Sequence, residues 1–322
     1  MRFGLAVPTC REASPYPLGF TSPRVLRDIA AAGERLGFHS LWANDHIAST
    51  AAQVAALAQA PNHYDPLVTF AFLAALTERI KLMTATIVTP LREPVLFAKQ
   101  VAVLDQLSGG RLVVGMGIGS QREEFEALAR NPKASRGAMQ DEFVAALRML
   151  LDEGGGSFSG RYFKFGDIAM APRPLQRPFP LYLSGNVPDA IERVASIANG
   201  WIVSLVSPDE MREKVALLRG LASAAGRDPA SIEVALFTQV SIAATEEAAQ
   251  AAFDAAQPGR RGRGHVGGGN RLIGTPDGIA ERLVAYRDAG VGHVGLVFLG
   301  RTPGEVVAGA TLFAEKVMPR LA

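Results

Sequence analysis

Cysteine is nearly absent from this chain of 322 residues, which contains only Cys10. A single thiol cannot form an internal disulfide or supply the sulfur ligands of a tetrathiolate metal site. Histidine is also scarce, with five in all and no His-x-His pair. Paired carboxylates are likewise missing from the ends of the predicted strands. This composition argues against a metal-dependent hydrolase and against a glycoside hydrolase, so we predict no metal site.

Excess charge and long apolar runs are missing as well. The net charge is only +2, so no strong field would attract nucleic acid or an anionic membrane. No apolar run approaches the ~18 residues of a membrane-spanning helix, and the first ten residues have a strand pattern rather than that of a signal peptide. We therefore expect a soluble, cytoplasmic protein whose partners are small molecules.

What the sequence does contain is a repeated alternation of strand and helix patterns. Eight segments have strand character: 2–8, 39–44, 81–88, 111–117, 180–184, 200–204, 232–240 and 293–299. Each is followed by a helical pattern, at 23–36, 65–77, 93–106, 135–151, 188–198, 208–225, 275–289 and 303–321. An open doubly wound sheet also alternates in this way, but eight complete units favour closure. The sequence predicts one (β/α)8 barrel domain spanning residues 1–322.

Three stretches interrupt this rhythm and are predicted to be insertions: 47–64, 154–179 and 241–273. The first and third follow strands, so they should emerge at the carboxyl face of the barrel and shape a pocket there. Within the third, the segment GRRGRGHVGGGN at 259–270 is rich in glycine and arginine and has the composition of a mobile surface loop. A role for this loop in binding nucleic acid is a distant alternative.

The titratable pair Asp45–His46 stands where the second predicted strand gives way to a loop. An imidazole at a barrel strand end can accept or donate a proton, whereas the alternative is a histidine bonded to loop backbone. Adjacent strand residues point to opposite faces, so Asp45 need not orient His46. Because the other strand ends carry few acids and bases, we expect a bound organic cofactor to supply the chemistry.

Small residues at 84–88 and 115–119 would allow a flat ring to approach the backbone closely. The Gly-x-Gly-x-Gly pattern at 115–119 follows the fourth strand and lacks the context of a dinucleotide fingerprint. Two segments at helix starts, Ser-Gly-Asn at 184–186 and Gly-Thr-Pro at 274–276, could bind a phosphate. Ordinary helix capping explains either of them equally well.

Several segments resemble the luciferase-like monooxygenase family, and within it the branch of probable F420-dependent oxidoreductases. LSGGRL, inside residues 77–119, is the most specific piece of this resemblance. The others are LGFHSLWANDHI at 36–47, REEFEAL at 122–128, SRGAMQDEFVAALRMLL at 135–151, FSGRYFKF at 158–165, PRPLQRPFPLYLSGN at 172–186 and residues 274–296. The similarity spans nearly the whole chain.

The resemblance implies a barrel that holds an isoalloxazine-type ring at its carboxyl face, usually in a homodimer. It implies that His46 is the acid or base near the reacting carbon and that Asp45 is its acidic neighbour. It also implies a bulge in the third strand, commonly with a non-prolyl cis peptide, against which the ring rests. By the same resemblance, the residues that contact the ring or its phosphate are Thr86, Ile87, Val88, Gly117, Ile118, Ser184, Gly185 and Asn186.

Two departures from the family pattern stand out. Some F420-dependent dehydrogenases have a glutamate just after the fourth strand where this chain has Ile118, so a second acid catalyst is in doubt. The segment at 184–186 reads Ser-Gly-Asn where many relatives have a Gly-Gly-Ser type sequence. The phosphate contacts are therefore expected to differ in detail.

Three functional hypotheses follow. The first is hydride transfer between coenzyme F420 and a small organic substrate, and the second is an FMN-dependent monooxygenase supplied by a separate reductase. The third is a non-catalytic flavin or deazaflavin binding protein. The substrate cannot be identified from the sequence. Four aromatic residues are candidates for the pocket lining, with core packing as the commoner explanation for each: Trp42, His63, Tyr64 and Phe125.

Overall fold

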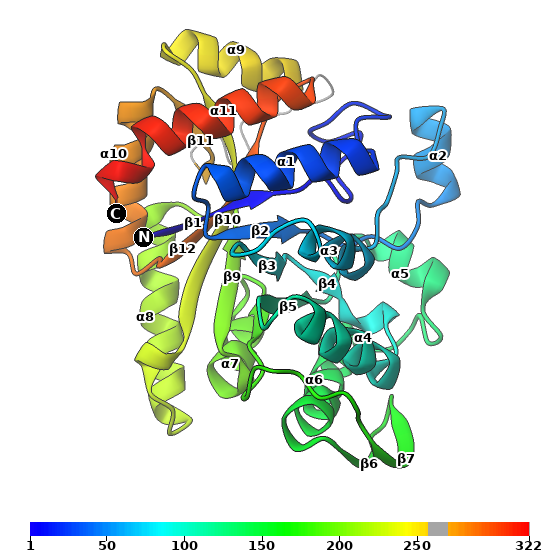
Figure 1. Ribbon diagram of the computed structural model, residues 1–322. Helices are drawn as coiled ribbons and strands as arrows, with labels where there is room; N and C mark the ends of the chain where they lie inside the picture. Colours follow the sequence, from blue (N-terminus) through cyan, green and yellow to red (C-terminus); the bar gives the residue numbers. More distant parts are fainter. Residues whose placement is uncertain (257–269, 322) are drawn as a thin grey trace.

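Eight parallel strands close into a barrel in the computed structural model, which describes residues 1–256 and 270–321. The strand order is β10-β12-β1-β2-β3-β5-β8-β9, and β9 pairs back with β10 to complete the ring (Figure 1). Their bounds are β1 Arg2–Ala6, β2 Ser40–Ala43, β3 Lys81–Thr84, β5 Leu112–Gly117, β8 Leu181–Ser184, β9 Gly200–Ser204, β10 Glu233–Ile242 and β12 His293–Phe298. The predicted (β/α)8 barrel is confirmed.

The helices that surround the barrel begin where the sequence predicts. They are α1 Pro23–Arg35, α3 Pro66–Ala74, α4 Pro94–Leu107, α6 Arg136–Arg148, α7 Pro188–Ile197, α8 Pro208–Ala224, α10 Pro276–Asp288 and α11 Pro303–Lys316. All but α6 begin with proline, whose fixed φ suits the first helical position and whose missing N–H is not needed there. Ser22, Asp65 and Ser135 are among the residues that cap these helices with a side-chain oxygen.

The barrel interior is built around Trp42 on β2. Its indole is fully buried, donates from Nε1 to Ser40 Oγ at 2.7 Å, and stacks on Phe237 with 5.3 Å between ring centroids. Gly4 on β1 and Gly295 on β12 leave room for this ring, because a Cβ at either position would collide with it. Trp42 is therefore a core residue and does not line the pocket as the sequence analysis had suggested.

The segment predicted as one strand at 81–88 is in fact two, β3 and β4 Ile87–Val88. Both pair with β5, but four residue steps from Met83 to Ile87 face only three from Val113 to Met116, which defines a bulge. The peptide bond between Ala85 and Thr86 is cis. The expected interruption of the third strand, with its non-prolyl cis peptide, is therefore present.

The predicted insertions contain additional elements. Residues 47–64 include α2 Ala51–Leu57, and the loop after β5 contains α5 Arg122–Leu128. Residues 241–273 include α9 Glu246–Ala256 and β11 Leu272–Gly274, but most of the predicted loop at 259–270 lies outside the described residues. Short helical turns complete the described elements: η1 Thr89–Leu91, η2 Met149–Glu153, η3 Pro229–Ser231 and η6 Met318–Arg320.

The insertion at 154–179 follows a helix and forms the antiparallel hairpin β6 Gly155–Ser159 and β7 Lys164–Ala169, beside α6 (Figure 1). Buried Asp105 near the end of α4 anchors its return, accepting from the backbone N–H groups of Leu175 at 2.7 Å and Gln176 at 3.1 Å. The hairpin therefore packs on the outer helices and does not extend the carboxyl rim.

The LSGGRL segment lies at the opposite end of the barrel from that rim, between the end of α4 and the start of β5. Arg111 donates to the carbonyl oxygens of Ala74 at 2.8 Å, Ile80 at 3.0 Å and Ser108 at 2.6 Å. These bonds satisfy carbonyl groups at the ends of α3 and α4 and join them to β3. Arg111 is therefore a structural residue.

Candidate functional site

A cavity of about 870 Å³ opens at the carboxyl rim of the barrel. Ten residues were proposed for the site from the sequence, and nine of them line this cavity: Asp45, His46, Thr86, Val88, Gly117, Ile118, Ser184, Gly185 and Asn186. The tenth, Ile87, is fully buried in the hydrophobic core, and its side chain does not reach the cavity. Sequence positions from four neighbouring strands thus meet at one rim.

His46 is held by an acidic partner from another element. Its Nδ1 lies 2.8 Å from Oε2 of Glu124, a buried residue of α5, while Oε1 of Glu124 accepts from the backbone N–H of Ile47 at 2.6 Å. Burial alone would raise the pKa of Glu124, but its hydrogen bonds with His46 and the backbone outweigh burial and lower this pKa. An ionised carboxylate only accepts, so Nδ1 of His46 carries the proton and Nε2 keeps a lone pair in the neutral ring.

The pairing of Glu124 with His46 was not predicted from the sequence. Glu124 lies in REEFEAL, a segment of the family resemblance, and nothing in the local pattern shows that residue 124 reaches a loop 78 positions earlier. The structure shows the difference between the two glutamates of this segment: Glu124 is buried with Phe125, whereas Glu123 is exposed. A carboxylate on the buried face of a short helix requires a partner.

The other predicted lining residues lie beside the cavity and not on its wall. The ring centroid of His63 is 5.4 Å from that of His46, and its Nε2 is 3.0 Å from Ser49 Oγ. Burial and the neighbouring His46 lower the pKa of His63, which keeps the ring neutral. Tyr64 and Phe125 pack against or within the core. The packing explanation therefore applies to both of these residues.

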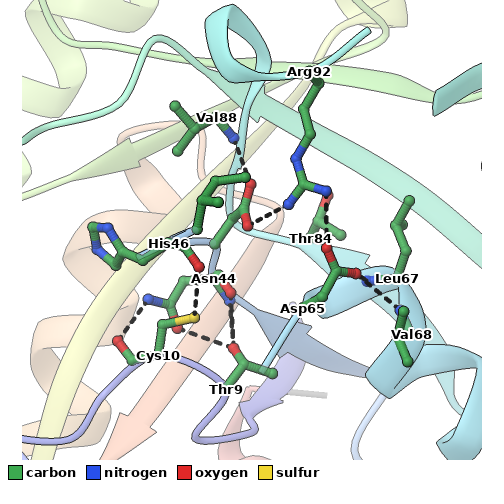
Figure 2. Close-up of polar contacts among 12 residues, drawn as sticks. Thr9, Cys10, Asn44, His46, Asp65, Leu67, Val68, Thr84, Val88 and Arg92 are labelled. Atoms are coloured by element: carbon green, nitrogen blue, oxygen red, sulfur yellow. Dashed lines mark hydrogen bonds and ion pairs between the residues drawn. The ribbon is translucent and has the colours of Figure 1, made fainter. Parts of the chain in front are cut away.

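Asp45 faces away from His46 and supports the bulge. Its Oδ2 accepts from the backbone N–H of Val88 at 3.0 Å, and its Oδ1 accepts from Arg92 at 2.6 Å, which also bonds Asp65 at 2.8 Å (Figure 2). The Asp45 side chain is completely buried. Burial lowers the pKa of Arg92, but the two carboxylates more than compensate and raise it. The ion pair thus fixes the backbone that forms one wall of the cavity.

The segment at 184–186 is positioned by its own contacts. The carbonyl of Gly185 accepts from Trp201 Nε1 at 2.8 Å, and Asn186 Nδ2 donates to Ser204 O at 2.6 Å. Within the described chain, no side chain caps the following helix α7 at Val187. Pro188 at its first position has no N–H, and the N–H of Ala190 donates to the carbonyl of Val187 at 3.0 Å, so in this first turn the N–H of Asp189 is the one left for a phosphate. At 274–276, by contrast, Thr275 caps α10 by accepting from Gly278 N–H, which is ordinary helix capping.

Across residues 1–256 and 270–321, no three His, Cys, Asp or Glu side chains are grouped so that they could hold a metal ion. In the same residues no helix has the length and apolar character needed to cross a membrane.

Cys10 lies next to the site but is predicted to be unreactive. Its buried thiol points to the carbonyl oxygen of His46 (Figure 2) and to that of Tyr64, and burial raises its pKa to about 12. Because the thiolate is the nucleophile, we expect native protein to react far more slowly with Ellman's reagent than urea-unfolded protein does. Equal labelling rates in the two states would contradict this packing.

Comparison with known proteins identifies the family. The model of the luciferase-like monooxygenase family matches residues 1–293. An FMNH2-dependent dimethylsulfone monooxygenase of Pseudomonas putida is 28% identical over 324 aligned residues, which cover 89% of this chain and 85% of that protein.

Two solved structures have the same fold over the whole chain. Monooxygenase RslO1 from Streptomyces bottropensis gives a TM-score of 0.80 at 24% identity, with 100% of both chains covered. The coenzyme F420-dependent tetrahydromethanopterin reductase from Methanopyrus kandleri gives 0.77 at 22% identity, with 100% of this chain and 99% of that chain covered. The barrel, the rim cavity and the family match agree: the chain belongs to the luciferase-like monooxygenase family, whose members among these relatives are oxidoreductases dependent on flavin or F420.

Proposed function

We propose that this protein is an oxidoreductase that uses a flavin-type coenzyme, with coenzyme F420 as the first candidate, and that His46 transfers the proton coupled to the redox step. The observation that carries the proposal is the His46–Glu124 pair at the wall of the rim cavity. In this proposal Glu124 orients the imidazole, and Nε2 exchanges the proton with substrate.

The chain's own residues fit a flat ring with a phosphate tail. Ala85, Thr86 and Gly117 form one wall, and a Cβ built at Gly117 would lie 2.6 Å from Thr86 Oγ1 and 2.7 Å from Ser184 Oγ. Glycine is therefore required at this position for the side chains of Thr86 and Ser184 to keep their places at the cavity wall. The start of α7, which no side chain caps, offers the N–H of Asp189 to a phosphate beside the proposed segment 184–186.

Each residue then has a distinct part in the reaction. When bound, the coenzyme would supply the electrons: F420 would transfer them as a hydride, whereas reduced FMN would react with O2. His46 holds or releases the coupled proton at Nε2. Asp45, which the sequence placed among the catalytic residues, acts through the backbone of Val88 and thus positions the wall against which the ring rests.

A second candidate is an FMN-dependent monooxygenase. It is favoured by the relationship to the dimethylsulfone monooxygenase, which covers most of both chains. The absence of an acid at position 118 points the same way, because some F420-dependent dehydrogenases of the family have a glutamate there. A homodimer, and for this second candidate a separate reductase partner, stay predictions.

Titration of the purified protein with F420 and with FMN, each oxidised and reduced, tests the proposal. We expect saturable fluorescence changes with F420 and weaker binding of FMN. The reverse preference would establish the second candidate, and no binding of either coenzyme would refute the proposed function. Binding without turnover over a broad substrate panel would indicate a non-catalytic binding protein.

A matched pair of glycine variants locates the coenzyme. Gly117→Val would displace the side chains of Thr86 and Ser184, which line the proposed ring space, and is expected to abolish coenzyme binding. Gly166→Val lies on the exposed hairpin, where a Cβ meets open space, and should bind the coenzyme normally. Circular dichroism confirms that both variants are folded. Normal coenzyme binding by Gly117→Val would remove this wall from the site.

A further inference from the structure

One cation of the rim cavity has no role in the proposed function. Arg11 follows β1 and lines the same cavity as His46. In the described part of the chain, no carboxylate forms an ion pair with its guanidinium, and its buried Nε has no hydrogen-bond partner. By contrast, the other arginine of this cavity, Arg193, is paired with Asp141. Burial lowers the pKa of Arg11, which reflects the cost of keeping this charge without an acid beside it.

The guanidinium is nevertheless held in one place. Its central carbon lies 4.9 Å from the ring centroid of Phe237, which also lines the cavity. Phe237 in turn stacks on Trp42, with 13° between the ring planes. Trp42, Phe237 and Arg11 thus form a column of stacked side chains that runs from the barrel interior to the rim. The cation–π contact with Phe237 covers one face of the Arg11 guanidinium. The N–H groups on the edge of the fork remain for a ligand.

The column stands on a different arc of the rim from the proposed coenzyme wall. Phe237 belongs to β10 and Arg11 follows β1, whereas the wall is formed by the bulge after β3 and by β5 and β8. His46, at the end of β2, lies between these two arcs in the strand order. A ligand group bound by Arg11 would therefore belong to the molecule that faces the coenzyme.

We infer that Arg11 binds an oxyanion of the substrate, so that the substrate is a small organic carboxylate or sulfonate. This inference rests on the proposed function, because it assumes that the coenzyme occupies the opposite wall. The planar fork of arginine matches both anions with two parallel hydrogen bonds. An anion would also supply the partner that the half-buried guanidinium lacks in the described structure.

Calorimetric titration with charged and neutral probes of similar shape tests this inference. The pairs are methanesulfonate against dimethyl sulfone and benzoate against benzamide, measured with and without bound coenzyme. For at least one pair, we expect wild type to bind the anion about tenfold more tightly or better. Arg11→Gln should lose this preference, and Arg11→Lys should retain part of it. No preference in the wild type, or an unchanged preference in Arg11→Gln, would overturn the inference.

Two controls separate substrate binding from other roles. Arg136→Gln removes a nearby cation that bonds the carbonyl of Gly119 and should leave the preference intact. Coenzyme affinity should be the same in Arg11→Gln as in wild type, and loss of coenzyme affinity alone would assign Arg11 to the coenzyme and overturn the inference. Because the probes are also titrated without coenzyme, a failure of the coenzyme proposal is distinguishable from a failure of this one.

The unfolding temperature of an Arg11 variant gives a second test, because a ligand-binding role and a structural role of Arg11 predict changes of opposite sign. Arg11→Met removes a half-buried cation without an acid partner and keeps an apolar chain on Phe237, so we expect it to unfold at a higher temperature than wild type while losing the anion preference. A lower unfolding temperature together with an intact preference would show that Arg11 serves the fold.

Discussion

Replacement of His46 by asparagine is expected to lower kcat by about 10²- to 10⁴-fold, the contribution typical of general acid–base catalysis. Coenzyme affinity should not change, because the proposed ring wall is formed by other residues. Steady-state turnover and coenzyme titration measure the two effects. His39→Asn is the matched control, since His39 precedes β2 at the opposite end of the barrel and should leave kcat unchanged. Unchanged turnover in His46→Asn would remove His46 from the mechanism.

Glu124→Gln tests whether the orientation of the imidazole matters. The carboxylate accepts the Nδ1 proton of His46, but a glutamine amide placed there can donate to Nδ1 and thereby shift the ring proton to Nε2. Nε2 would then lack the lone pair that the proposed proton transfer uses. We expect kcat to fall by about 10²-fold or more with KM nearly unchanged, because the ring stays in place in the wrong tautomer. A variant with full kcat would show that the pair only holds the loop.

Removal of Arg92 should have the largest effect on stability. Arg92→Met leaves the completely buried carboxylate of Asp45 without its cation, and breaking such a pair costs about 3–5 kcal/mol of the free energy of unfolding. Urea denaturation followed by circular dichroism measures this loss. The double variant Asp45→Asn with Arg92→Met should recover most of it, because no uncompensated charge remains.

An exposed ion pair provides the comparison. Arg122 pairs with Glu126 one turn along α5, and both side chains are solvent-accessible. Arg122→Met should therefore leave the free energy of unfolding nearly unchanged. If Arg92→Met were equally harmless, the Asp45–Arg92 pair would not be what holds the bulge in place.

Local signals predicted the barrel well. Proline at the first helical position and capping side chains mark where helices begin, and these act within a few residues of one another. The strand that follows each helix was equally visible as an apolar segment. Eight complete strand–helix units predicted closure into a barrel, because the rules for connecting parallel strands through helices allow few arrangements of eight such units.

Features that depend on distant residues were harder to predict. The break between β3 and β4 accompanies side-chain bonding to the backbone of β5 and to Asp45, including Thr84 Oγ1 to Gly115 O at 2.8 Å. The contact of Glu124 with His46 joins helix α5 to the loop after β2, and no periodicity in the sequence connects the two. Strand geometry correctly predicted that the side chains of Asp45 and His46 point in different directions. The groups that each side chain contacts are seen only in the structure.

The position of Arg111 explains why a short shared motif reveals so little about the reaction. The LSGGRL segment, on which the resemblance rested most specifically, joins helix ends at the end of the barrel opposite the rim where Arg11 and His46 lie. Two relatives could share the segment letter for letter and still differ in the molecule that they oxidise or reduce, so sorting the family by chemistry requires comparing the positions that correspond to 11 and 237.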